Sequence, residues 1–221
     1  MPNIVGEAPF QIRSGKTEVT RFYAILASSV IVIVIGVTLG LELFWRKDTG
    51  DCTGGQVAGG AVGGSFELQG GNGQTVTDRD IIDRPTLVYF GYTFCPDVCP
   101  FDVARNAVAV DLLSERGIEV RPVFISVDPE RDTPDVVSEF AEAYHPDMIG
   151  LTGTQEQVKA VSKAYRVYFK LRNGGGDSHY LVDHSTFTYL MFPGNVFADF
   201  FRRDVVPEDM ASRVACFVES A

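Results

Sequence analysis

The sequence predicts an α/β domain preceded by one N-terminal transmembrane helix. Three observations carry this prediction. An uncharged apolar stretch lies near the N-terminus, and a glycine-rich stretch follows it. Beyond these, short β-branched and aromatic runs alternate with segments of helical periodicity. Such alternation is typical of a sheet with helices packed against its faces.

The apolar stretch runs from Phe22 to Leu41 and reads FYAILASSVIVIVIGVTLGL. At the rise of an α-helix, about 20 apolar residues span the hydrocarbon core of a bilayer. A cleaved signal peptide is the alternative, but its apolar region would be shorter and would end at a small-residue cleavage site. The sequence therefore favours an uncleaved anchor over residues 22–44, behind an N-terminal cytoplasmic tail over residues 1–21.

Basic residues on the two sides predict the orientation of this anchor. Arg13, Lys16 and Arg21 precede it, whereas Arg46 and Lys47 follow it. Because cytoplasmic flanks carry the excess of Lys and Arg, we expect a single-pass protein with its C-terminal domain in the periplasm. The tail also contains acidic residues, unlike a mitochondrial presequence, so a bacterial inner membrane is favoured over a mitochondrial inner membrane facing the intermembrane space.

Composition assigns the next segment and restricts the partners. Residues 45–64 are expected to form a flexible linker, because seven of the sixteen residues from Thr49 to Gly64 are glycine. The chain has 19 Lys and Arg against 29 Asp and Glu, a formal net charge of −10. This acidic balance argues against a nucleic-acid partner, which would require clustered Lys and Arg.

The domain proper is predicted over residues 65–221. Strand patterns occur at Ser65–Leu68, Thr86–Tyr92, Glu119–Val127, Phe187–Phe192 and Val196–Phe201, and helical patterns at Phe101–Leu112, Val136–Tyr144, Thr154–Tyr165 and Val206–Glu219. Pro122 lacks an N–H group and is expected at the start or edge of its strand. Strand–helix–strand–helix, then a hairpin and a final helix, is the order of a thioredoxin-like fold with parallel strands in its first half.

The chemistry is concentrated in GYTFCPDVCP, residues 91–100, where a predicted buried strand leads into a helix. Backbone N–H groups and the helix dipole favour a thiolate at such a turn, and the thiolate is the form that binds metals. The three residues between Cys95 and Cys99 allow either a bound metal or a disulfide. Since Pro100 is disfavoured inside a helix, we expect Cys95 in the loop and Cys99 at the helix start. A purely structural disulfide is the alternative.

A histidine can complete a metal site with these cysteines. Two thiolates are soft ligands suited to Cu(I), and a nitrogen ligand would make the site three-coordinate. His145, before a proline in an acidic loop, is interpreted as a solvated surface residue. His179 and His184 are five residues apart, so an extended segment would place them on opposite faces. We favour His184, with Asp183 and Ser185 orienting its imidazole.

These residues resemble the SCO/SenC family of copper chaperones of cytochrome c oxidase. The resemblance rests on four segments: GYTFCPDVCP at 91–100, ISVDPERDTP at 125–134, KAYRVYFK at 163–170 and DHSTFTYLMFPG at 183–194. It implies a thioredoxin-like fold in which Cys95, Cys99 and His184 bind copper, as Cu(I) and with Cu(II) left open. It also implies delivery of copper to the dinuclear site of cytochrome c oxidase subunit II, with another periplasmic copper donor left open as a further partner.

Three alternative functions use the same two cysteines. A thiol–disulfide oxidoreductase would act through Cys95 and Cys99 without a metal and would reduce subunit II or another extracytoplasmic client. A peroxidase of the peroxiredoxin kind would need an activating arginine near Cys95. A redox-sensing binding module would need only the reversible disulfide. We expect ligand exchange rather than enzymatic turnover, so no catalytic residue is assigned.

The acidic segment from Asp128 to Asp132 follows a predicted strand and should therefore lie near the site. Its carboxylates could guide copper or a partner. However, Asp132-Thr133-Pro134 is a helix-start signature, and we favour a role for the acids in capping that helix.

Two cysteines remain outside the motif. Cys52 lies in the linker and Cys216 in the final predicted helix. Free thiols are unusual outside the cytoplasm, so one hypothesis is a Cys52–Cys216 disulfide that pins the linker to the domain. The other hypothesis is that Cys216 is a small buried apolar residue and Cys52 is incidental.

Overall fold

The computed structural model describes Tyr23, Ile31, residues 33–38, Cys52, residues 61–172 and residues 180–220. The chain divides into two units, Met1–Asp51 and Cys52–Ala221. Among the described residues, no helix is both long enough and apolar enough to cross a membrane. Most of the proposed anchor at 22–44 and of the linker at 45–64 lies outside the described residues, so both assignments stay predictions.

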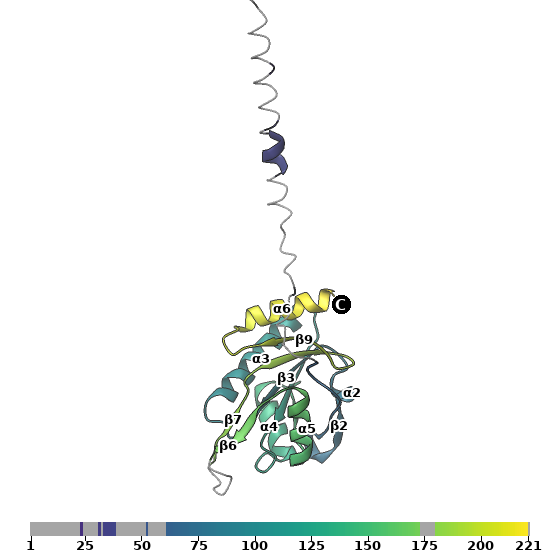
Figure 1. The fold of residues 1–221 in the computed structure, drawn as a ribbon. Helices are drawn as coiled ribbons and strands as arrows, with labels where there is room; N and C mark the ends of the chain where they lie inside the picture. The colour runs from purple at the N-terminus through teal and green to yellow at the C-terminus, as the bar shows by residue number, and fades with distance from the viewer. Residues whose placement is uncertain are drawn as a thin grey trace, which may run out of the picture. The chain divides into compact units, whose positions relative to one another are not determined.

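A five-stranded sheet forms the centre of the second unit (Figure 1). Its strands lie in the order β5 (Ile149–Leu151), β4 (Arg121–Ser126), β3 (Thr86–Gly91), β8 (Thr188–Phe192) and β9 (Val196–Phe201). The pairs β3–β4 and β4–β5 are parallel, whereas β3–β8 and β8–β9 are antiparallel. All residues of β3 are buried, as its mostly β-branched and aromatic sequence, without a charged residue, predicts for a central strand.

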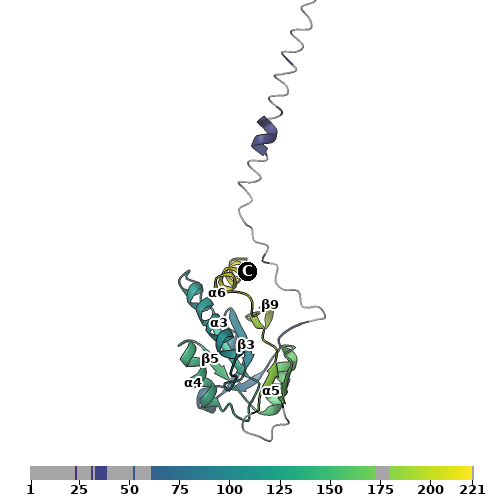
Figure 2. The same cartoon turned by 90° about the vertical axis from the view of Figure 1, so that its left-hand side faces the viewer.

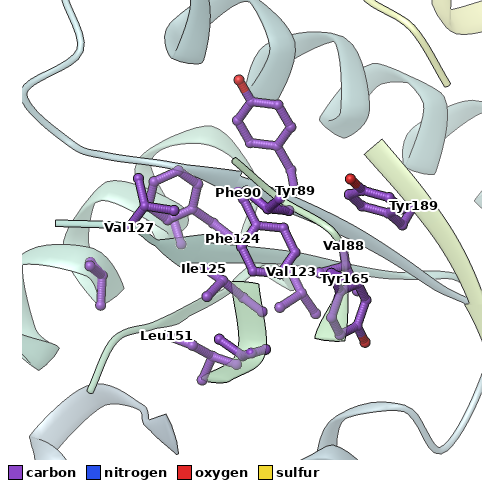
Figure 3. Close-up of a cluster of buried hydrophobic side chains, with 14 of the residues drawn as sticks. Val88, Tyr89, Phe90, Val123, Phe124, Ile125, Val127, Leu151, Tyr165 and Tyr189 are labelled. Atoms are coloured by element: carbon purple, nitrogen blue, oxygen red, sulfur yellow. The ribbon is translucent and has the colours of Figure 1, made fainter. Parts of the chain in front are cut away.

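Helices cover both faces of this sheet (Figure 2). Helices α3 (Val98–Ser114), α4 (Pro134–Tyr144) and α6 (Pro207–Ser220) lie on one side, and α5 (Gln155–Ala164) lies on the other. Side chains alternate along β3, so the ring of Phe90 contacts Tyr165 while Tyr89 points the opposite way, toward α3 (Figure 3). This mixed sheet between helices is the predicted thioredoxin-like architecture.

The strands and helices expected from the sequence are confirmed, with ends that differ by at most three residues. Pro122 is the second residue of β4 and lies just before the pairing with β5 begins at Val123, as its missing N–H requires. The sequence did not reveal five short elements, namely β2 (Thr75–Thr77), α2 (Asp78–Ile81), β5, β6 (Phe169–Leu171) and β7 (Val182–His184). Elements of three or four residues are too short to show a hydrophobic period. The remaining elements are β1 (Glu67–Gln69), which pairs with β2, and the short 3-10 turn η1 (Gly71–Gly73).

A disulfide bond joins Cys52 to Cys216 in α6, with the two Cα atoms 5.8 Å apart. This confirms the disulfide hypothesis and rules out the alternative in which Cys52 is incidental. Closer to β1, Val62 is buried in the core, and the N–H of Gly63 donates to the carbonyl of Ala164. The chain before β1 is therefore attached to the domain at two separate places.

Candidate metal centre

Three segments bring the predicted ligands together. Cys95 lies in the loop between β3 and α3, Cys99 is the second residue of α3, and His184 is the last residue of β7. Their ligand atoms all lie within 4.8 Å of one another, and no other described His, Cys, Asp and Glu residues form such a group. The prediction that these three side chains converge is confirmed. The competing candidate His179 lies outside the described residues.

The two sulfurs lie beneath the cysteine loop rather than on its surface. The side chain of Cys99 is fully buried and Cys95 is 7% exposed, whereas Phe94 beside them is 58% exposed. The N–H of Cys99 points to Cys95 Sγ at 3.4 Å, as the start of a helix should direct its free amides. The predicted placement, with Cys95 in the loop and Cys99 at the helix start, is therefore correct.

Gly91, the last residue of β3, gives Cys99 the space to approach the sheet. A Cβ atom at this position would lie 2.9 Å from Cys99 Sγ and 3.0 Å from the rings of Phe124 and Tyr89. Because real Cβ contacts are essentially never that short, only glycine fits without displacing a neighbour.

His184 presents one particular nitrogen to the cysteines. Its Nδ1 lies 2.8 Å from the backbone carbonyl oxygen of Ser185, which can only accept, so Nδ1 carries the ring proton. Nε2 then offers a lone pair, and it lies 3.2 Å from Cys99 Sγ. The rings of Tyr89 and Tyr92 pack edge-on against the imidazole, with centroid distances of 6.3 and 5.8 Å. The imidazole is thus oriented with its free nitrogen toward the sulfurs.

Of the two residues expected to orient His184, Ser185 does so through its backbone carbonyl, whereas the expectation for Asp183 is wrong. Asp183 pairs with Arg172 across the β6–β7 hairpin, and Ser185 Oγ accepts from the N–H of Tyr168. Adjacent residues of an extended strand point to opposite sides, so neither side chain faces the same way as His184. Ser185 contributes only its carbonyl oxygen.

The two thiols differ in acidity. A hydrogen bond from the Cys99 thiol, with help from the backbone N–H groups of Asp97 and Cys99, holds the pKa of Cys95 well below its ordinary value. The same bond, together with burial, raises the pKa of Cys99. The reduced pair therefore carries one negative charge, on Cys95, and a metal bound by both sulfurs must displace the proton of Cys99.

Asp132 fixes the cysteine loop. It is fully buried and accepts hydrogen bonds from Thr93 N at 3.0 Å, from Thr93 Oγ1 at 2.5 Å and from Ser126 Oγ at 2.5 Å. The helix start is where the sequence placed it, but the N-cap of α4 is Thr133, which accepts from the N–H of Val136. The expectation that Asp132 caps this helix is therefore wrong, because its oxygens are already occupied by donors from the cysteine loop and β4.

His145 is buried, with 7% of its surface exposed, so its interpretation as a solvated residue is wrong. Its Nδ1 accepts from the N–H of Asp147, and its Nε2 lies 3.2 Å from Asp111 on α3. It lines a cleft of about 710 Å³ together with Arg121 at the start of β4 and Ile149 at the start of β5, two strands that run parallel to β3. The cysteine loop follows the opposite end of β3, so His145 is no part of the metal centre.

Sequence reasoning also missed a buried polar chain behind Cys99. Tyr89 donates through its hydroxyl to Asp102, whose carboxylate lies 3.8 Å from Arg105 and 3.6 Å from Arg203. Burial, above all, raises the pKa of Tyr89, so its hydroxyl remains a donor. The available signal was Asp102 itself, an acidic residue one turn after Cys99 in the predicted helix.

The sequence of this chain is similar to those of known proteins. A sequence model described as SCO1/SenC matches residues 55–219. Protein SenC of Rhodobacter capsulatus is 51% identical over 206 residues, which cover 89% of this chain and 90% of that protein. The similarity therefore includes the whole domain that carries the three ligands.

Two solved structures agree with the family match. The crystal structure of Arabidopsis thaliana ScoI with copper bound is 40% identical, with a TM-score of 0.68, over 73% of this chain and all of that one. Bradyrhizobium japonicum ScoI with copper bound is 37% identical, with a TM-score of 0.63, over 70% of this chain and 98% of that one. On the matching sequence and fold, this chain belongs to the SCO1/SenC family.

Proposed function

We propose that this protein binds copper through Cys95, Cys99 and His184 and delivers it to the dinuclear copper site of cytochrome c oxidase subunit II. The convergence of two sulfurs and one imidazole nitrogen within 4.8 Å carries the proposal. Thiolates select Cu(I), and imidazole is a suitable third ligand. The structures of two relatives, 40% and 37% identical, have been solved with copper bound, which supports copper as the ion.

The ligands are prepared to different degrees. Cys95 is already a thiolate at neutral pH, and Nε2 of His184 already presents its lone pair. Cys99 loses its proton as the ion enters, so binding releases one proton per site. With three protein ligands, one side of the ion stays open to a thiolate or imidazole of the acceptor, and transfer proceeds by ligand exchange.

The surface beside the site suits transfer between proteins. Phe94 and Phe101 flank the two cysteines and are 58% and 69% exposed. An acceptor that covers these rings would exclude water while the ligands exchange. The predicted anchor at 22–44 and linker at 45–64 would keep the domain at the periplasmic face of the membrane, where they raise its effective concentration near the oxidase.

A second function, thiol–disulfide exchange on the same subunit, is favoured by the unequal acidity of the cysteines. The Cys95 thiolate would attack a client disulfide and form a mixed disulfide with one client sulfur. Cys99 would then attack Cys95, which releases the client as a dithiol and leaves a Cys95–Cys99 disulfide. The peroxidase alternative has less support, because Arg131 beside the loop donates to Asp128 and to the carbonyl of Tyr180.

An anaerobic Cu(I) titration of the reduced protein tests the proposal. We expect one Cu(I) per wild-type chain and a severe loss of affinity in Cys95→Ala, Cys99→Ala and His184→Ala. His145→Ala is the matched control, since this histidine is buried but lies outside the site. Unchanged stoichiometry and affinity in His184→Ala would remove the imidazole from the site and leave a dithiol.

A transfer assay separates the two functions. Copper-loaded protein is mixed with the copper-free soluble domain of subunit II, first with its cysteines reduced and then with them oxidised. The chaperone role requires metal transfer to the reduced form and depends on His184. Reduction of the oxidised form that survives in His184→Ala would instead identify the exchange reaction of the two cysteines.

A further inference from the structure

The strand that carries His184 belongs to a separate hairpin. β6 and β7 form a two-stranded sheet of their own, in which Phe169 pairs with His184 (Figure 1). Phe169 and Leu171 also line a cavity of about 120 Å³ against Val127 and α5, so the packing beneath β6 is incomplete. The central sheet therefore does not fix the distance between His184 and the cysteines, and side-chain contacts must do so.

Arg131 lies between the β6–β7 hairpin that carries His184, the histidine hairpin, and the loop between β3 and α3 that carries Cys95, the cysteine loop. Its Nη1 donates to the carbonyl oxygen of Tyr180 at 2.9 Å, and its guanidinium carbon lies 3.7 Å from the centroid of the Tyr180 ring. The same guanidinium carbon also lies 5.0 Å from the centroid of the Phe94 ring and 5.6 Å from that of the Tyr92 ring. A single side chain thus contacts the approach to β7 and the residues just before Cys95.

The position of this guanidinium is itself fixed by a buried carboxylate. Arg131 Nε donates to Asp128 Oδ2 at 2.6 Å, and the Tyr180 hydroxyl donates to Asp128 Oδ1 at 2.6 Å. Asp128 is 2% exposed and Tyr180 is 6% exposed. Removing one member of such a group leaves a buried charge without its partner, so the arrangement has few alternatives of similar energy.

We propose that Arg131 is a positioning residue that holds His184 against the two cysteines and so decides whether the centre offers two ligands or three. Without the guanidinium, the carbonyl of Tyr180 loses its donor and the ring loses its stacking partner, and the hairpin can move away. The sulfurs stay in place, because Asp132 independently anchors Thr93. Two thiolates alone still suit Cu(I), whereas Cu(II) depends more on the imidazole, so the loss should be larger for Cu(II).

A double-mutant cycle tests the copper part of this inference, which rests on the proposed function. We expect Arg131→Ala to weaken Cu(II) binding about tenfold, a coupling within the range for residues of one network. In a His184→Ala background the same substitution should have no further effect, because the ligand that it positions is gone. Equal losses in both backgrounds would overturn the inference. Arg84→Ala is the control, since Arg84 pairs with Asp83 and Glu119 away from the site.

A measurement on the metal-free protein keeps the inference separate from the proposed function. The N–H of Ser185 donates to the carbonyl of Tyr168, so its hydrogen exchange reports how firmly the hairpin end is held. We expect Arg131→Ala to speed this exchange while amides of β3 remain protected. If copper fails to bind the wild-type protein but the exchange still responds, the positioning role stands and the chaperone function falls. Unchanged exchange overturns the positioning role.

Should Arg131→Ala not fold, Tyr180→Phe provides the same test more gently. It removes only the hydroxyl that donates to Asp128 and keeps the ring under the guanidinium. The expected result is a smaller acceleration of Ser185 exchange in the same direction. No acceleration in this variant, with Asp128 still buried, would equally overturn the inference.

Discussion

Replacing Gly91 by alanine places one methyl group against the metal centre. The new Cβ would lie 2.9 Å from Cys99 Sγ and 3.0 Å from atoms of the Phe124 and Tyr89 rings. The φ angle of Gly91 is not positive, so the backbone conformation itself suits alanine and only the contacts oppose it. The substitution is therefore a clean test of whether space at residue 91 sets the position of Cys99.

The magnitude follows from which neighbour can move. The rings of Phe124 and Tyr89 are fully buried in the core, whereas Cys99 Sγ is a single atom at the end of a short side chain. Overpacking of this kind costs about 1–3 kcal/mol of folding free energy. We expect Cys99 to take up the displacement. Because both sulfurs must return to bind a metal, the same strain should lower copper affinity by about 5- to 150-fold.

Thermal unfolding and a competitive Cu(I) titration of the full chain measure the two effects. The midpoint should fall by about 2–4 °C for each kcal/mol in a domain of this size. Gly70→Ala is the matched control, since φ at Gly70 is −95° and its Cβ would meet Leu151 at an ordinary 3.7 Å. Equal midpoints and equal affinities in the two variants would refute the reasoning.

Three further predictions concern other features of the domain. In the reduced, metal-free protein, ultraviolet absorbance should show that one thiolate forms well below the pKa of about 8.5 of an unperturbed cysteine, because the pKa of Cys95 is lowered. Cys99→Ala should shift that titration upward, since it removes the main hydrogen bond to the thiolate, and an unshifted curve would contradict the assigned donor. Cys216→Ser should lower the free energy of unfolding by about 2–5 kcal/mol in a urea titration, because it opens the bond to Cys52, yet copper affinity should not change. His145→Ala should destabilise the domain by about 1–3 kcal/mol by the same measurement and leave copper binding intact, which would fail if His145 were a ligand.

Long apolar runs made most of the sheet predictable. The sequence of β3 is mostly β-branched and aromatic, and β9 begins and ends at the residues predicted for it, Val196 and Phe201. By contrast, β5, β6 and β7 each have three residues. Such strands exist because distant partners pair with them, and no period within three residues reports a partner elsewhere in the chain.

The identities of the ligands could also be predicted, but their orientation could not. Soft-ligand chemistry and the family resemblance pointed to the two cysteines and His184. Which group orients the imidazole depends on the direction in which each residue of β7 points, and β7 itself was not recognised. Sequence proximity suggested both Asp183 and Ser185. The strand geometry turns the Asp183 carboxylate away, whereas Ser185 orients the ring through its backbone carbonyl, which no side-chain pattern could show.

The segment from Asp128 to Asp132 shows why local patterns fail at the centre of this site. The local sequence around an aspartate does not show whether its carboxylate caps a helix or accepts hydrogen bonds from groups elsewhere in the chain. The positions of the donors decide between these roles, and here the donors are Thr93, 39 residues before Asp132, and Tyr180, 52 residues after Asp128. One five-residue turn thereby connects the cysteine loop to the histidine hairpin, two segments that no short-range pattern relates. Substitutions in this turn should therefore change copper affinity through the spacing of the ligands, although none of its residues is a ligand.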